Sequence, residues 1–128
     1  MLVIVHEELS EKEHDLRSSL VDMAVEAWRF GKVVDRMMAK LDAGEKGRYV
    51  NQFRWFLKKT EETLGRSGLR IVNLEGHPFD PGFAASPLNL EDFGPDDALF
   101  VDQMIEPVIM DDAGIVRTGT VMLRRRDS

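Results

Sequence analysis

The 128-residue sequence contains no cysteine, which excludes disulfide bonds and thiolate metal sites and is typical of a protein from a reducing compartment. Long apolar runs are also missing. The apolar run at residues 1–5 has no basic segment before it and is followed by His6 and two glutamates, so it fits neither a signal peptide nor a membrane span. These absences predict a cytoplasmic protein that does not bind membranes.

Lysine and arginine are absent from residues 71–116, a segment that holds ten of the chain's acidic residues. Residues 12–70 include both acidic and basic side chains, and Arg124-Arg125-Arg126 lies near the C-terminus. Nucleic-acid binding requires a basic stripe on the reading surface, so this distribution argues against a nucleic-acid partner. The arginine triplet has two interpretations: it protects the end of an edge strand from further pairing, or it contacts an anionic surface.

The sequence also lacks a recognisable catalytic or cofactor-binding pattern. His6, Glu7 and His14 form the only local cluster of histidine and carboxylate, and their spacing is not that of a zinc-binding helix. His77 lies in a proline-rich turn, where a hydrogen bond to the backbone is its ordinary role. No glycine-rich phosphate loop is present. We therefore expect no catalytic residue, no metal and no cofactor, and a hydrolytic or metal enzyme is the weakest alternative.

An unbroken apolar heptad pattern indicates a long first helix that needs partner helices. A second apolar stripe, containing Val21 and Trp28, flanks the first, and two stripes suit a four-helix bundle. Ser10 and Glu13 form a candidate capping box at the helix start. The residues of the heptad seam are Leu16, Leu20, Met23, Ala27, Phe30, Val34, Met37 and Leu41.

A second helix is expected after a turn bracketed by Gly44 and Gly47, and it should end near Gly65 and Gly68. The two helices carry more large aromatic residues than one hairpin can bury. We therefore predict a homodimer in which two hairpins form a four-helix bundle, with Phe53 and Phe56 joining the seam in the interface. The alternative is that the rest of the chain folds back over the apolar stripe.

Residues 69–128 follow a strand pattern. Strands are expected at 69–74, 99–105, 107–110 and 115–123, with a hairpin turn at residues 111–114 and only short structure in the loop 82–97. The sequence thus predicts an α+β protein with a helical dimerisation region, residues 1–68, and a small, mostly antiparallel β domain, residues 69–128.

After the first expected strand of the β domain comes the proline-rich turn Gly76-His77-Pro78-Phe79-Asp80-Pro81. The prolines remove backbone donors and the glycine permits a positive φ, so neither a helix nor a central strand can pass through this segment. We expect Phe79 to anchor the turn, although an ordinary loop remains the alternative. The residues assigned to this structural turn are Gly76, Pro78, Phe79, Asp80 and Pro81.

The order of two helices, the G-x-P-F-D-P turn and a β region ending near Gly114 to Arg117 and residues 121–123 resembles the GrpE family over residues 16–124. GrpE proteins are nucleotide exchange factors of DnaK-type chaperones. The resemblance implies a dimer whose β domain binds the nucleotide-binding domain of the chaperone and promotes ADP release. It also implies partner contacts on the exposed face of the β ribbon, at Met104, Met110 and Arg117.

The chain departs from the GrpE pattern in the region that would face the chaperone. The family usually has His-Glu-Ala where this chain has Ala84-Ala85-Ser86, and Lys-Gly-Tyr where it has Ile105-Glu106-Pro107. Most of the family's long N-terminal helix is also missing by this alignment. A second function therefore remains open, that of a GrpE-fold scaffold or assembly protein with another partner and no exchange activity.

Overall fold

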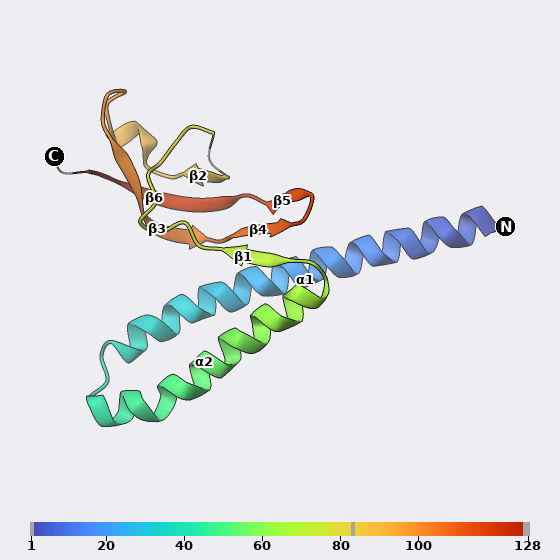
Figure 1. Cartoon of the computed structure of the whole chain (residues 1–128), viewed down its shortest axis with the longest axis horizontal. Coiled ribbons are helices and arrows are strands. Elements are labelled where there is room, and N and C mark those ends of the chain that lie inside the picture. Colours follow the sequence, from blue (N-terminus) through green and yellow to red (C-terminus); the bar gives the residue numbers. More distant parts are fainter. Residues whose placement is uncertain (1, 83, 127–128) are drawn as a thin grey trace. The chain divides into compact units, whose positions relative to one another are not determined.

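The computed structural model describes residues 2–82 and 84–126 and divides into two compact units, Met1–Ser67 and Gly68–Ser128 (Figure 1). The first unit is helical and the second contains two small sheets, so the predicted α+β class is confirmed. The division falls one residue before the predicted domain boundary. Within the described residues, neither helix has a stretch that is both long and apolar enough to cross a lipid bilayer.

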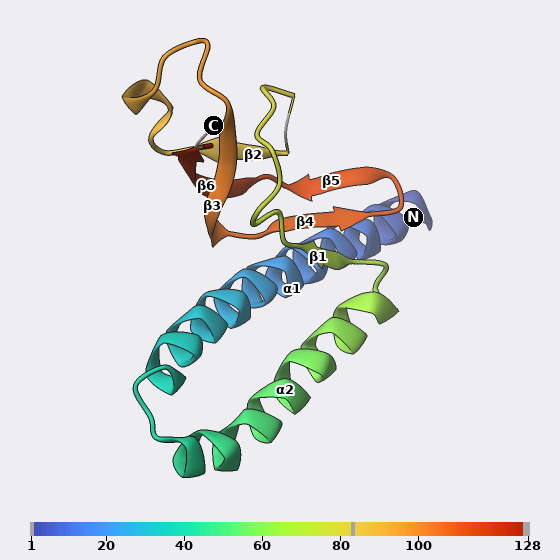
Figure 2. The same ribbon diagram turned by 60° about the vertical axis from the view of Figure 1, so that its left-hand side comes forward.

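The helical unit is an antiparallel hairpin of α1, Leu2–Met38, and α2, Ala43–Arg66 (Figure 2). At 1.5 Å per residue the helices are about 55 and 36 Å long, so the first part of α1 extends beyond the end of α2. The predicted start of the first helix at Ser10 is wrong. Because α1 already begins at Leu2, Ser10 lies inside the helix, where there is no free terminal amide for it to cap.

The connection between the helices also lies earlier than predicted, at residues 39–42 rather than around Gly44 and Gly47. Asp42 is the N-cap of α2, and its Oδ1 accepts a hydrogen bond of 2.9 Å from the Glu45 amide. This cap outweighs the low helix propensity of the two glycines, which lie in the first turns of α2. At the other end, Gly68 adopts a φ of 72°, which agrees with the predicted C-terminus of the helix.

The helices pack small residues of α1 against large residues of α2. A side chain on Gly31 would come within 3.4 Å of the Phe53 ring, so the glycine permits close approach of the two helices at this point. Farther from the connection, Ala24 and Leu64 are both buried. The side of α2 that carries Phe53 and Leu64 thus faces α1.

The β unit contains two three-stranded sheets. One has the order β1-β4-β5 and is antiparallel; the other has the order β2-β6-β3, with β2 parallel and β3 antiparallel to β6. The strands are β1 Arg70–Val72, β2 Ala85–Pro87, β3 Leu99–Glu106, β4 Val108–Asp111, β5 Gly114–Arg117 and β6 Gly119–Arg125, with a short 3-10 helix, η1, at Leu90–Asp92.

The single strand predicted at residues 115–123 is in fact two strands in different sheets, β5 and β6, separated by Thr118. Gly119 lies at this crossing point and is buried. A Cβ atom there would approach both the carbonyl oxygen of Glu106 and Cγ2 of Val108 to 2.9 Å. Because any side chain at this position would make these close contacts, the chain passes from one sheet to the other at a glycine. Glycine is common where strands bend tightly.

The core of the β unit is formed where the two sheets meet. Val101, Val108, Ile109 and Val121 have no exposed surface. Pro107 is also buried and separates β3 from β4, as its missing amide donor predicted. Among the described residues of the loop 82–97, β2 and η1 are the regular elements, in agreement with the expectation of short structure there.

A side chain continues the hydrogen bonding of β6 beyond the end of β2. The Leu88 amide donates to the Val121 carbonyl at 3.0 Å, and the next pair is made by the Asn89 carboxamide. Its Oδ1 accepts from the Leu123 amide at 2.9 Å, and its Nδ2 donates to the Leu123 carbonyl at 3.0 Å. Asn89 therefore acts as one further residue of a neighbouring strand.

Candidate functional site

The proline-rich turn lies along the first half of β3. The Gly76 amide donates to the Val101 carbonyl at 2.8 Å, and the Phe79 amide donates to the Leu99 carbonyl at 2.9 Å. Gly76 has a φ of 84°, in the region that glycine adopts without strain. Phe79 itself is half-buried. The turn thus extends the backbone pairing of β3, which is compatible with the structural role expected for it.

Of the three predicted partner contacts, Met104 is not on an exposed face. It is 2% exposed, and its Sδ accepts a hydrogen bond of 2.9 Å from the Leu74 amide. The expectation failed because the pairing of β3 with β6 shifts register between Val101 and Gln103 and again between Met104 and Glu106. Such irregularities change which side chains face the core and leave no mark in a simple alternating pattern.

Met110 and Arg117 are half-buried and lie on neighbouring strands, β4 and β5. Met110 pairs with Ile115, whose side chain is 52% exposed and whose neighbour Val116 is 37% exposed. The two surviving candidates therefore belong to a hairpin that carries exposed apolar side chains. We call residues 108–117 the β4–β5 hairpin.

The turn of this hairpin is closed by Asp111. Its Oδ1 accepts hydrogen bonds from the Ala113 amide at 2.8 Å and the Gly114 amide at 3.0 Å. The hairpin turn predicted at residues 111–114 agrees with this geometry. Among the described residues, no three His, Asp or Glu side chains are grouped so that they could hold a metal ion. The His6 and Glu7 side chains lie outside that part.

The predicted dimer seam runs along α1 to Leu41 in the connection between the helices, and it divides into an outer and an inner row. The outer row, with one residue in every seven, is largely exposed; the inner row is half-buried. The outer row consists of Leu16, Met23, Phe30 and Met37, which are 70, 69, 58 and 59% exposed, and the inner row of Leu20, Ala27, Val34 and Leu41.

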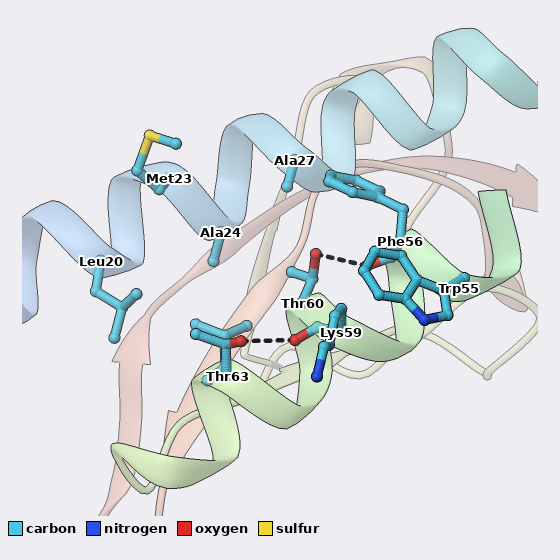
Figure 3. Close-up of a pocket in the computed structure, with 10 residues that line it drawn as sticks. Leu20, Met23, Ala24, Ala27, Trp55, Phe56, Lys59, Thr60 and Thr63 are labelled. Carbon is cyan, nitrogen blue, oxygen red and sulfur yellow. Dashed lines mark hydrogen bonds between the residues drawn. The ribbon is translucent and has the colours of Figure 1, made fainter. Parts of the chain in front are cut away.

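The neighbouring side of α2 adds further exposed apolar side chains. Tyr49 is 45%, Trp55 63% and Phe56 38% exposed, whereas Phe53 is half-buried beside α1. Figure 3 shows Phe56 directed toward Ala27 of α1. We call the surface formed by the outer row of α1 together with Tyr49, Trp55 and Phe56 the apolar face.

The apolar face is hollowed between the helices, and the groove has a volume of about 350 Å³ (Figure 3). The Thr60 and Thr63 hydroxyls donate back to the Phe56 and Lys59 carbonyls at 2.9 and 2.7 Å, which satisfies their donors within α2. The groove is therefore a mainly hydrophobic surface. Its lining residues are Leu20, Met23, Ala24, Ala27, Trp55, Phe56, Lys59, Thr60, Thr63 and Leu64.

Four of the ten lining residues, Leu20, Met23, Ala27 and Phe56, were predicted from the sequence as interface positions. Ala24, Trp55 and Thr63 were not. Tyr49, Phe56 and Thr63 are seven residues apart, and this repeat is the signal that could have revealed a matching stripe on α2. Comparison of the chain with protein-family models, with curated proteins and with solved structures finds no match.

Proposed function

We propose that this chain forms a homodimeric four-helix bundle and acts as a GrpE-like co-chaperone that promotes ADP release from a DnaK-type chaperone. The dimer is supported by the apolar face. Its seven side chains present roughly 800 Å² to solvent if a fully exposed side chain of this size has about 200 Å². A standard interface buries about 800 Å² per partner, so a second copy would cover a surface of suitable size.

A second copy of this chain suits this surface because the exposed side chains of the outer row follow the predicted heptad pattern. The four residues of the outer row recur every seven residues and are largely exposed, as a helix that packs against a further helix requires. Pairing two such faces across a two-fold axis gives each helix two neighbours. The dimer thus accounts for both apolar stripes of α1.

The exchange activity is supported by the resemblance of the G-x-P-F-D-P turn and of the order of elements to GrpE. In this proposal the β4–β5 hairpin contacts the chaperone through Met110, Arg117 and the exposed Ile115. Exchange requires no bond to be made or broken. The protein would bind the open, nucleotide-free chaperone more tightly than the closed form and so shift the population toward ADP release.

The exchange proposal is tested by loading a DnaK-type chaperone from the same source with fluorescent ADP and measuring nucleotide release after the protein is added. We expect faster release, and a smaller effect with Arg117→Ala. Arg124→Ala is the matched control because it removes the same charge from an exposed site on β6. If native dimer does not accelerate release at low ionic strength, the exchange function is wrong.

One observation favours the second function, a scaffold or assembly protein that has a different partner. Met104 is buried, so one of the three contacts implied by the resemblance is committed to the core of the β unit. The departures at Ala84–Ser86 and Ile105–Pro107 concern the same β unit. A stable dimer without exchange activity, recovered from lysate with another protein, would support this function.

A further inference from the structure

Strands β3 to β6 form one long hairpin that bends where the two sheets meet. Before the bend, β3 pairs with β6, and the last pair is Glu106 with Thr120. After the bend, β4 pairs with β5, and the first pair is Ile109 with Arg117. We call the edge of each strand that faces away from its partner in this hairpin its outer edge. The long hairpin therefore has one outer edge along β3 and β4 and another along β6 and β5.

Residues 70–79 cover the outer edge of β3 and β4. β1 pairs with three of the four residues of β4. Beside β3, the Val101 amide donates to the His77 carbonyl at 2.9 Å, and the Met104 amide donates to Glu75 Oε1 at 3.2 Å. This edge thus has partners within the β unit on both sides of the bend.

Residues 84–89 cover the outer edge of β6 but not that of β5. The Ala84 carbonyl accepts from the Gly119 amide at 3.1 Å, β2 follows, and Asn89 occupies the backbone of Leu123. This cover begins at Gly119, the first residue of β6. In the sheet β1-β4-β5, no strand among the described residues lies beyond β5 (Figure 2). Of the four strands of the long hairpin, β5 is thus the one whose outer edge has no neighbouring strand.

The outer edge of β5 presents both backbone groups and apolar side chains. Asp111 and Gly114 close the two-residue turn as a hydrogen-bonded pair, and the two kinds of pair alternate along an antiparallel ladder. The amide and carbonyl of Ile115, in the next pair, therefore point outward, and among the described residues they have no hydrogen bond there. Ile115 and Val116 are 52 and 37% exposed, and successive side chains of a strand lie on opposite faces of the sheet.

The two strands that flank the long hairpin have features that oppose further pairing. β1 is three residues long and begins with the exposed Arg70, and β2 is three residues long and includes Pro87, which has no amide donor. β5 contains no proline, and its one charged residue is the last, Arg117. Its middle residues are β-branched, a type that favours strands. The edge of β5 is therefore suited to accept a further strand.

We infer that the outer edge of β5 binds an extended segment of another protein, which adds a strand to the sheet in line with β2. Such a segment pairs with the Ile115 backbone and covers apolar side chains on both faces of the sheet, which a helix does not do because its own backbone groups are paired. The site extends over residues 114–118, about 17 Å of strand. The inference goes beyond the proposed function, in which the β4–β5 hairpin contacts its partner through side chains, and it does not depend on exchange activity.

Charge indicates the composition of the bound segment. Residues 71–116 contain no lysine or arginine. At the turn beside the site, the Asp112 side chain is fully exposed, and its nearest cation is the Arg70 guanidinium at 3.9 Å. A segment with alternating β-branched residues and a basic residue at the end beside this turn therefore complements the edge in both shape and charge.

The inference is tested with the peptide acetyl-Lys-Thr-Val-Thr-Val-Thr-amide and the full chain labelled with ¹⁵N. We expect the peptide to shift the amide resonances of residues 114–118 and to slow hydrogen exchange of the Ile115 amide. The slowing should be about tenfold when nine-tenths of the sites are occupied, since exchange then proceeds from the unoccupied fraction. The control is the same peptide with N-methyl groups on its two central residues. These remove a donor from each edge of the peptide, so the control should not bind.

Ile115→Lys should weaken binding of the peptide about tenfold or more, because the added strand loses the burial of an isoleucine and meets a charge. Ile105→Lys is the matched control. Ile105 is also an exposed isoleucine of the β unit, at 38%, but it lies on β3, away from residues 114–118. Circular dichroism should show that both variants keep the native fold.

Three results would overturn the inference. They are unshifted resonances of residues 114–118 at millimolar peptide, equal binding of the N-methylated peptide, and slow exchange of the Ile115 amide before any peptide is added. The second result would assign the contact to side chains alone, and the third would show that the edge is already covered. Native protein that accelerates nucleotide release but fails these tests retains the proposed function without the inference. Protein that binds the peptide at β5 without accelerating release retains the inference alone.

Discussion

Phe30→Asp should separate the proposed dimer into folded monomers. Phe30 is 58% exposed in the single chain, so the fold of the hairpin does not depend on its burial, whereas the dimer would cover it. Covering this fraction of a side chain of about 200 Å², at about 25 cal/mol per Å², contributes about 3 kcal/mol. The two-fold axis doubles the contribution to about 6 kcal/mol per dimer.

A loss of about 6 kcal/mol corresponds to a rise of about 10⁴-fold in Kd, and even half of that burial gives about a hundredfold. The aspartate adds the cost of placing a charge in an apolar interface. The assay is sedimentation equilibrium over a range of concentrations, with circular dichroism to show that helix content is retained. Ser18→Asp is the control because it adds the same charge to an exposed position of α1 outside the heptad seam. A Phe30→Asp chain that dimerises as tightly as native protein would refute the reasoning.

Three further changes test the fold of the two units. Phe79→Ala should destabilise the β unit by about 1–3 kcal/mol, because the side chain is half-buried, and thermal unfolding should show it; an unchanged melting temperature with lost partner binding would instead make Phe79 a contact residue. Gly119→Ala should cost about 1–3 kcal/mol, since the Cβ would be 2.9 Å from the Glu106 carbonyl oxygen; urea unfolding checks this, with the exposed Gly94→Ala as control. Asp42→Ala should cost about 1 kcal/mol in the same assay by removing the cap of α2, and no change would show that the Glu45 amide finds another acceptor.

The sequence predicted the helices better than their ends. The apolar spacing of α1 extends over many turns, so its helical period was unambiguous, and the exposed and half-buried rows follow the same period. The position at which a helix begins or ends depends on single side chains that compete to cap it. Ser10 has the chemistry of a cap but lies inside a longer helix, whereas Asp42, which was not singled out, supplies the cap of α2.

The sequence predicted β1, β3 and β4 close to their observed positions, but neither β2 nor the arrangement of the strands in two sheets. Pro107 and the turn at Asp111 mark local breaks that depend on one residue each, and both lie where they were expected. The division of residues 115–123 between two sheets depends on a distant contact at Gly119, which a local pattern does not contain. The burial of Met104 likewise follows from register shifts in β3. Long-range pairing therefore decided what local signals left undetermined.

The Asn89 carboxamide has a consequence for how the β unit behaves toward other chains. Beyond β2, the backbone of β6 would expose an amide and a carbonyl at Leu123, and such unpaired groups are a template on which a foreign strand can form. The Asn89 side chain occupies both groups, at 2.9 and 3.0 Å, without adding a strand that has an edge of its own. One amide side chain thus closes this edge against aggregation, and a leucine of similar size at the same position would leave it open.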